Sequence, residues 1–370
     1  IVTGCLAQRY REEILKEIPE VDAVLGTASY DDILEAVEKT LKGEKYLSFR
    51  PTDRLVDTGG GRIITTGGAY EYLRIAEGCA KHCTYCVIPK VRGGYRSIPM
   101  ERLLDTARQM VGEGVKELIV IAQETTLYGT DLYGKKSLHI LLEKLCRIEG
   151  LVWIRLLYCY PEEIYPELVD TIAREPKICH YLDLPIQHCS DSILKRMGRK
   201  TTKADLERII TEIRERIPDM VIRTTLITGF PGETKEDHEE LMQFVADMAF
   251  DRLGVFTYSP EEDTPAAAME NQVPEEVKEQ RKAELMELQQ DISLELDQER
   301  IGEELLVFVE GKVADENAYV GRTYADAPGI DGYIFVNTGE SLMTGDFVRV
   351  KVTGALEYDL IGEIADEYTE

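Results

Sequence analysis

Between residues 70 and 260, short apolar runs typical of buried strands alternate with segments whose apolar residues recur at helical spacing. Six such units in succession predict a parallel sheet with right-handed crossovers, because parallel neighbours need a long connection. We therefore expect an α/β fold, an open six-stranded (β/α)6 partial barrel that binds ligands at the carboxyl ends of its strands. The expected strands are 70–76, 117–122, 153–157, 181–184, 221–228 and 252–256, and the expected helices are 100–112, 138–147, 166–174, 202–216 and 235–248.

Three cysteines follow the first expected strand directly, in the run EGCAKHCTYCVIPKVRGG. The thiolates of Cys79, Cys83 and Cys86 can ligate three corners of a 4Fe–4S cluster and leave the fourth iron free to bind a small molecule. This spacing, with Tyr85 before the last cysteine, is typical of the radical S-adenosylmethionine (SAM) enzymes, in which SAM chelates that iron. These three cysteines are therefore the predicted catalytic and metal-binding residues, at the ligand-binding end of the barrel.

Other uses of the cysteines fit less well. A structural zinc site with His82 as its fourth ligand remains an alternative, although zinc ligands usually come as two separated pairs. Eight cysteines scattered over 370 residues do not indicate a disulfide scaffold. Neither a secretory segment nor an apolar run of about 18 residues is present. We therefore predict a reduced, cytoplasmic compartment and no membrane association.

The charge of the chain restricts its partners. Its 43 basic and 69 acidic residues give a formal net charge of −26. Such a chain repels nucleic-acid phosphates unless it carries a local basic patch, and its field attracts basic partners. Solubility alone is the alternative explanation of this acidity. RNA binding is accordingly not expected.

The residues before the partial barrel predict part of a second α/β domain over 1–45. A strand ends near Cys5, and a helix over 11–18, a strand over 21–25 and a helix over 31–41 follow it. This pattern matches the second half of such a domain. Residues 46–69 are polar and glycine-rich and are expected to form a linker.

The residues after the partial barrel, which is expected to end at 272, change in character. Residues 273–301 predict an acidic connecting helix. In 302–370, five short β runs alternate with Gly, Asn and Asp turns, a pattern typical of a small antiparallel β-barrel.

A series of motifs runs through the chain in the order found in one family. GCLAQRY surrounds Cys5, and it is followed by EGCAKHCTYCVIPKVRG, AQETTLYG, LPIQHCSDSILKRMGR, RTTLITGFPGE and FTYSPEEDTPAAAM. With these motifs the chain resembles the radical SAM methylthiotransferases over nearly its whole length, and its last segment is similar to their TRAM domain. The resemblance implies two 4Fe–4S clusters, one that cleaves SAM and an auxiliary one that provides sulfur. It also implies an electron donor such as flavodoxin or ferredoxin, and a sulfur donor.

The family has two substrate branches. One modifies adenosine in transfer RNA, and the other adds a methylthio group to the β-carbon of an aspartate in the basic small-subunit ribosomal protein S-twelve. The run SPEEDT favours the protein branch, because Glu262 stands where the RNA branch typically has arginine, although Asp263 replaces a usual glycine. GRTYADAPGIDGYIFV and the four basic against fifteen acidic residues of 301–370 favour it too. Glu261 and Glu262 are the predicted substrate-binding residues, and transfer RNA is the alternative substrate.

The resemblance also implies three auxiliary-cluster cysteines in the N-terminal domain. Cys5 matches the last of them, and the other two would lie upstream of Ile1. We therefore expect that an N-terminal segment is missing and that the auxiliary cluster cannot assemble normally. In that case the chain would be a SAM-cleaving and substrate-docking module without complete sulfur insertion.

Further residues are expected near the cofactor, each with a purely structural role as its alternative. Glu124 replaces the usual aspartate beside Gln123, where related enzymes contact the amino group of SAM. The turn that holds Gly229 and Gly232 is expected to let the backbone approach the adenine. The predicted cofactor-binding residues are Gln123, Glu124, Arg155, Gln187, Arg199 (for the SAM carboxylate), Arg223, Gly229 and Gly232.

The remaining candidates are weaker. Lys90, Arg92 and Arg96 follow the cysteine loop and are expected to offset the charge of the cluster or of a substrate carboxylate, or to be merely solvated. Local packing and hydrogen bonding are favoured for a last group, which comprises Cys146, Cys159, Cys179, His188 and Cys189. Core packing is also favoured for Tyr158 and Tyr160, with a place in the lining of the substrate cleft as the alternative.

Overall fold

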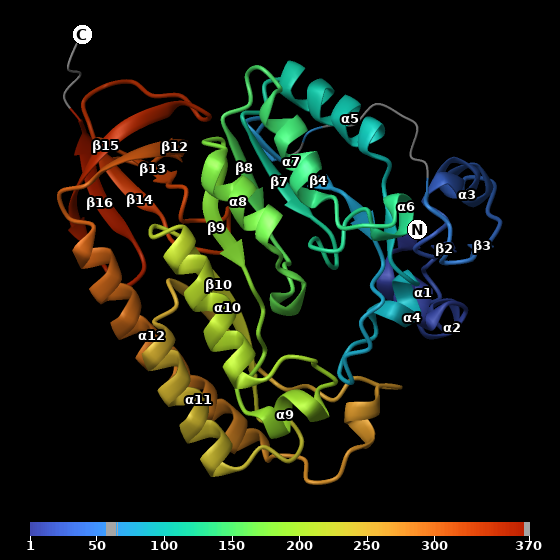
Figure 1. The fold of residues 1–370 in the computed structure, drawn as a ribbon. Coiled ribbons are helices and arrows are strands. Elements are labelled where there is room, and N and C mark those ends of the chain that lie inside the picture. The colour runs from blue at the N-terminus through green and yellow to red at the C-terminus, as the bar shows by residue number, and fades with distance from the viewer. Residues whose placement is uncertain (57–63, 65, 366–370) are drawn as a thin grey trace.

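Six parallel strands form the central sheet of the computed structural model, which describes residues 1–56, 64 and 66–365 (Figure 1). Their order is β11-β10-β9-β8-β7-β4, and each neighbouring pair is parallel, which confirms the predicted (β/α)6 partial barrel. The strands are β4 (Tyr70–Arg74), β7 (Glu117–Ile121), β8 (Trp153–Leu156), β9 (Ile178–Asp183), β10 (Val221–Thr228) and β11 (Arg252–Thr257).

The connecting helices bury their apolar faces against this sheet. On α10, for example, Leu206 and Ile213 are buried, and the helix begins with a capping box in which Thr202 and Asp205 each accept a backbone N–H of the other. The helical spacing of the apolar residues is the pattern that predicted these helices from the sequence. The helices are α5 (Met100–Gly112), α7 (Leu138–Cys146), α8 (Pro166–Arg174), α10 (Lys203–Arg216) and α11 (Lys235–Met248).

A three-stranded parallel sheet forms the N-terminal part, in the order β1 (Val2–Thr3), β2 (Ala23–Leu25) and β3 (Tyr46–Ser48). The helix expected over 11–18 is present as the shorter α2, but a separate helix, α1, was missed before it. The backbone of Arg11 turns to a φ of 45° and separates the two. β3 lies inside the segment expected to be a linker, since a three-residue strand leaves almost no periodic signal. The helices are α1 (Cys5–Tyr10), α2 (Glu13–Glu17), the 3-10 turn η1 (Tyr30–Asp32) and α3 (Ile33–Thr40).

The helix α12 (Glu275–Glu299) leads from the sheet to a closed five-stranded barrel with the order β12-β13-β14-β16-β15. Four of its pairings are antiparallel, but β14 and β16 are parallel, so the expectation of a fully antiparallel barrel is wrong at this pairing. The strands are β12 (Glu304–Lys312), β13 (Ala318–Arg322), β14 (Ile334–Asn337), β15 (Phe347–Ala355) and β16 (Leu360–Ile364).

The C-terminal barrel closes the amino ends of the central strands, on the side away from the N-terminal sheet (Figure 1). Glu117, the first residue of β7, forms buried ion pairs with Arg155 of β8 and with Arg322 of β13. Trp153 stacks edge-on against Phe347, with ring centroids 4.8 Å apart. The C-terminal barrel therefore covers the amino ends of β7 and β8, and the carboxyl ends of the strands lie at the opposite end of the partial barrel.

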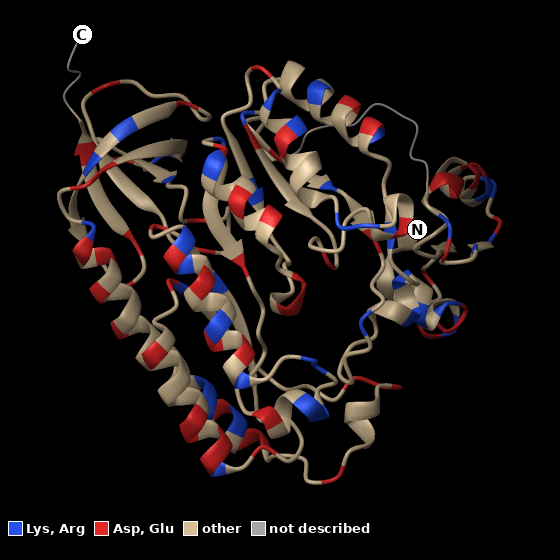
Figure 2. Ribbon diagram, in the orientation of Figure 1, with Lys and Arg blue, Asp and Glu red and all other residues tan. Residues whose placement is uncertain are grey.

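Acidic residues occur in all three parts of the chain, including the helices α11 and α12 (Figure 2). Basic residues are interspersed among them along these helices. Across the residues that the structure describes, no helix is both long enough and apolar enough to cross a bilayer.

Candidate active site

The cysteine loop leaves β4 through the short strand β5 (Ala76–Glu77) and lies at the open end of the partial barrel. The loop is anchored from three sides. The N–H of Gly78 donates to Oε1 of Gln123 at 2.7 Å, beyond the end of β7. The N–H of Cys79 donates to the carbonyl of Gly93, and that of Thr84 to the carbonyl of Met197. The protein therefore fixes the backbone of this loop before any ligand binds.

Cys79 and Cys83 are buried, and Cys86 is half-buried. The backbone N–H of Lys81 lies 3.4 Å from Sγ of Cys79, and that of Ile88 lies 3.4 Å from Sγ of Cys86. Such N–H groups stabilise thiolate charge in iron–sulfur sites. Burial raises the pKa of the Cys79 thiol to about 11, so this thiol must lose its proton when it binds a metal.

In the described ranges (1–56, 64 and 66–365), no three His, Cys, Asp or Glu side chains gather closely enough to hold a single metal ion. A 4Fe–4S cluster does not require this, because each of its thiolates binds a different iron. The anchored loop, the two buried thiols and the N–H groups directed at sulfur fit such a cluster.

A buried carboxylate lies beside this loop. Glu124 follows β7 and is 0% exposed; its Oε1 accepts the N–H of Thr126 at 2.9 Å. Its Oε2 has no hydrogen-bond partner among the described residues. Burial raises the pKa of Glu124 to about 7, so the carboxyl is poised to take up a cation at neutral pH.

A buried guanidinium lies on the Cys83 side of the loop. Arg199 stacks over the ring of Tyr160, with 4.3 Å from Cζ to the centroid, and the Tyr160 hydroxyl lies 3.7 Å from Sγ of Cys83. One Arg199 nitrogen donates to the carbonyl of Pro185, but Nε and the other terminal nitrogen have no partner in the described part of the chain. The nitrogen that bonds Pro185 also lies 3.6 Å from a carboxylate oxygen of Glu162, so the charge of Arg199 is paired. Its two remaining nitrogens can still donate to an anionic ligand.

The N-terminal part reaches the same region through Cys5. Nε of Arg92, in the helix α4 (Ile88–Arg92), lies 3.0 Å from Sγ of Cys5, and a terminal nitrogen of Arg92 pairs with Glu77 at 2.9 Å. Arg92 thus links Cys5 to the strand that leads into the cysteine loop. The sequence placed Cys5 near a cluster only through the family resemblance, since 73 residues separate it from Cys79 without any local signal.

The family model of the Radical SAM superfamily matches residues 73–245, and that of the TRAM domain matches residues 301–365. The ribosomal protein uS12 methylthiotransferase RimO of Lachnoclostridium phytofermentans is 61% identical over 362 residues, which are 98% of this chain and 82% of that protein. The chain belongs to the RimO family. A RimO of Clostridium botulinum strain Hall is 50% identical over 371 residues, covering all of this chain and 83% of its relative.

Membership in the RimO family confirms the predicted radical SAM methylthiotransferase family and implies 4Fe–4S and SAM as cofactors. Among solved structures, the cobalamin-dependent SAM radical enzyme OxsB has a TM-score of 0.47 at 13% identity, over 78% of this chain and 43% of that chain. A likeness of this size carries no statement about the reaction.

Two arginines expected to bind the cofactor of this RimO site have other partners. Arg155 is 0% exposed and donates to Glu117 and to the carbonyls of Thr323 and Tyr324, at the amino ends of the strands. The expectation that Arg155 binds the cofactor is therefore wrong. The same correction applies to Arg223, because Asp183 and Asp331 hold its guanidinium and Asp331 belongs to the C-terminal barrel.

The glycine turn is constrained by its own backbone. Gly229 and Gly232 have φ values of 71° and 84°, and a Cβ atom at either would lie 2.2 Å from a side-chain atom, of Lys278 and Arg196 respectively. The positive φ values favour glycine at both positions, and the predicted approach of the cofactor to this turn stays a prediction. Gln187 (φ 72°) lies between β9 and β10, where its backbone pairs with Thr225 and Ile227.

The loop that carries the expected substrate residues is held by α1 and α4. Arg9 pairs with Glu261 at 2.6 Å, the Tyr10 hydroxyl lies 3.4 Å from a carboxylate oxygen of Glu262, and Lys90 bonds to the carbonyl of Asp263. The loop therefore spans the open end between the two domains. Its partners Arg9 and Tyr10 were missed, because nothing in the local sequence joins segments 252 residues apart.

The residues for which packing was expected are buried or internally bonded, except Tyr158, whose side chain is 46% exposed. The expectation that Tyr158 packs in the core is therefore wrong. Nδ1 of His188 accepts the N–H of Ser190 at 3.0 Å, and burial lowers the pKa of His188 to about 3, so the ring is neutral. The cysteines outside the loop, Cys146, Cys159, Cys179 and Cys189, are buried and free.

Proposed function

We propose that this chain is a radical SAM methylthiotransferase that adds a methylthio group to the β-carbon of an aspartate in ribosomal protein uS12. Its relatives at 61% and 50% identity carry the name ribosomal protein uS12 methylthiotransferase RimO. We propose as well that it works in the cytoplasm with a separate electron donor, such as flavodoxin or ferredoxin, and a sulfur donor.

The observation that carries the proposal is a pair of buried side chains of opposite charge beside the cysteine loop, each with polar atoms that lack a hydrogen-bond partner. Among the described residues, these atoms are one carboxylate oxygen of Glu124 and two guanidinium nitrogens of Arg199. The methionine part of SAM carries an ammonium and a carboxylate, which these two groups complement. Glu162, at 3.6 Å, pairs with the third nitrogen of Arg199 and leaves the other two available.

The residues divide the work as follows. Cys79, Cys83 and Cys86 would hold the cluster, Glu124 would bind the ammonium of SAM and Arg199 its carboxylate. When bound, the cluster and SAM supply the radical chemistry that activates the C–H bond. Gln123 fixes the loop through Gly78, and Tyr160 positions Arg199 by stacking. Cys5 is the residue in this chain that we assign to an auxiliary cluster.

The test is anaerobic reconstitution with iron and sulfide, followed by reaction with SAM, a reductant and either uS12 or transfer RNA. We expect a methylthio group on one aspartate of uS12 by mass spectrometry and unmodified transfer RNA. Methylthiolated adenosine with unmodified uS12 would overturn the proposed substrate, and absence of SAM cleavage would overturn the proposed chemistry.

SAM binding is expected to strengthen as the pH rises through about 7. The ionised form of Glu124 binds an ammonium and the protonated form does not, and the pKa of Glu124 is raised to about 7. Glu124→Gln should remove this pH dependence and weaken binding about tenfold or more at about pH 8, because a charge-assisted bond is lost. Equilibrium binding of SAM to the reconstituted protein measures both effects.

Glu143→Gln, a change on the outer helix α7, is the matched control and should keep the wild-type profile. A Glu124→Gln variant that retains the pH dependence would show that another group binds the ammonium.

Glu262→Lys is expected to weaken the binding of uS12 about tenfold at low salt, and less at high salt, because the partner is basic. Glu262 should matter more than Glu261, since Arg9 already neutralises Glu261. Binding of labelled uS12 at two salt concentrations measures the effect. The exposed Glu270→Lys is the control, and equal losses in both variants would indicate general charge repulsion instead of a specific contact.

A further inference from the structure

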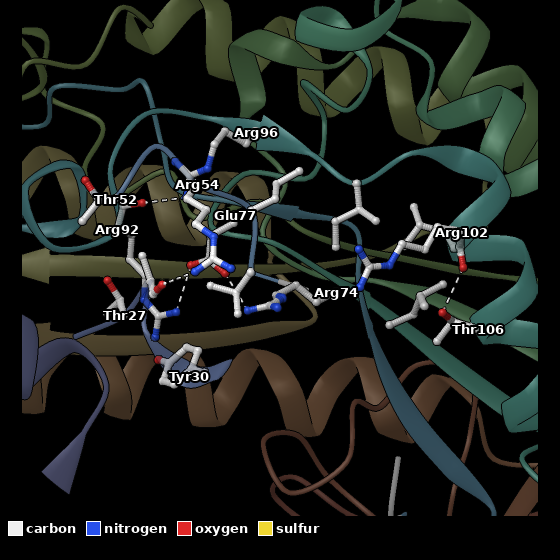
Figure 3. A pocket seen from close by; sticks show the side chains of 16 residues that line it. Thr27, Tyr30, Thr52, Arg54, Arg74, Glu77, Arg92, Arg96, Arg102 and Thr106 are labelled. Atoms are coloured by element: carbon white, nitrogen blue, oxygen red, sulfur yellow. Dashed lines mark hydrogen bonds and ion pairs between the residues drawn. The ribbon is translucent and has the colours of Figure 1, made fainter. Parts of the chain in front are cut away.

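A cavity of about 130 Å³ lies in the seam between the N-terminal part and the partial barrel (Figure 3). Thr27, Tyr30 and Arg54 line it from the N-terminal side. Its most notable feature in a chain of net charge −26 is its basic lining, which contains the arginines Arg54, Arg74, Arg92, Arg96 and Arg102.

Among the described residues that line this cavity, arginines outnumber carboxylates. Glu77 is the one carboxylate among the described lining residues, and it pairs with both Arg74 and Arg92. Arg54 pairs with Asp31 instead. Arg74, Arg92 and Arg96 therefore share a single carboxylate, and like charges held together in a partly buried space are unfavourable without an anion.

Arg96 is the least satisfied of the three. Its terminal nitrogens donate to the backbone carbonyls of Gly94 and Arg92, but its Nε is buried and has no partner among the described residues. Burial lowers the pKa of Arg96, although Glu77 and Asp53 act in the opposite direction. Nε of Arg96 therefore remains available to an anionic ligand.

We propose that this cavity binds a small oxyanion with the chemistry of phosphate, held by Arg96 together with Arg74 and Arg92. Guanidinium groups match the oxygens of phosphate with paired hydrogen bonds. The cavity is smaller than the 300–1,000 Å³ typical of sites for drug-sized ligands, which favours an inorganic ion over a nucleotide.

The site lies where the two domains meet. Thr27 and Tyr30 line it from the N-terminal side, whereas Arg74, Arg92 and Arg96, which would hold the ion, belong to the partial barrel. Arg92 also contacts Sγ of Cys5, so the ion and Cys5 share one guanidinium. A bound oxyanion would therefore stabilise the docking of the N-terminal domain next to the cysteine loop, whether or not the enzyme acts on uS12.

The test is titration of the full chain with inorganic phosphate, followed by ³¹P line broadening and calorimetry. We expect saturable binding that sulfate displaces and chloride does not. Arg96→Met should weaken it about tenfold or more, because charge-assisted bonds are lost. Arg108→Met, an exposed arginine that pairs with Asp105 on α5, is the matched control and should bind as the wild type does.

A second variant separates binding from folding. Thr106→Trp fills the cavity from α5 and leaves every arginine in place, so phosphate binding should be lost while circular dichroism is unchanged. ADP is tested in parallel: Arg96-dependent binding of ADP would support the same phosphate chemistry with a nucleotide as its source. Absence of saturable phosphate and ADP binding, or equal phosphate binding by the wild type and Arg96→Met, would overturn the proposal.

Discussion

Cys83→Ala is expected to lose cluster binding and to lower SAM cleavage by more than about 100-fold, since even partners of metal ligands typically contribute about 10- to 100-fold. The fold should persist, because the loop is anchored by Gln123, Gly93 and Met197 and not by the thiol. Iron per chain after anaerobic reconstitution, the electron paramagnetic resonance with and without SAM, and 5′-deoxyadenosine formation measure the loss.

Cys146→Ala is the matched control for Cys83→Ala. Cys146 is also a buried cysteine, but it lies on α7 away from the loop, so its variant should retain iron and SAM cleavage. Global unfolding of Cys83→Ala by circular dichroism would contradict the open-site cluster and favour a structural zinc site.

The sequence predicted those features of the fold whose determining residues lie close together along the chain. The central strands and helices were visible because each carries its own signal, such as the apolar run of β7 or the capping box of α10. The short strand β3 carries no such signal. The parallel pairing of β14 with β16 depends on contacts around the whole C-terminal barrel.

The candidate site divides in the same way. Cys79, Cys83 and Cys86 lie within eight residues, so their spacing alone predicts a shared ligand. Arg155 was misplaced because a strand sequence shows that a residue lies on the inner face but not which end of the barrel its long side chain reaches. Its partners in the C-terminal barrel lie 168 and 169 residues away.

The largest effect on stability is expected where the C-terminal barrel covers the amino ends of the central strands. Glu117→Leu should lower the free energy of unfolding by about 3–5 kcal/mol, because it leaves the buried guanidinium groups of Arg155 and Arg322 without a shared carboxylate. The midpoint of thermal unfolding should fall by roughly 10 °C. Glu304→Leu, an exposed change on β12, should stay within about 0.5 kcal/mol of the wild type.

Low pH should also lower the free energy of unfolding of the wild type. Burial alone would raise the pKa of Glu117, but Arg322 and Arg155 lower it below its ordinary value of 4.5. A lowered folded-state pKa contributes stability that is present above 4.5 and is lost as the pH falls through the folded value. The difference in stability between the wild type and Glu117→Leu should therefore shrink below about pH 4.5.

The fluorescence of Trp153 reports on the contact between the partial barrel and the C-terminal barrel, where Glu117→Leu is expected to act. Trp153 is the single tryptophan of the chain, is 5% exposed and packs against Phe347 of the C-terminal barrel. If the ion pairs of Glu117 hold the C-terminal barrel in place, the emission of Trp153 should shift to the red at a lower denaturant concentration in Glu117→Leu than in the wild type. An unchanged midpoint would show that the apolar contacts around Trp153 suffice, and the buried charges would then serve the orientation of the barrel instead of its stability.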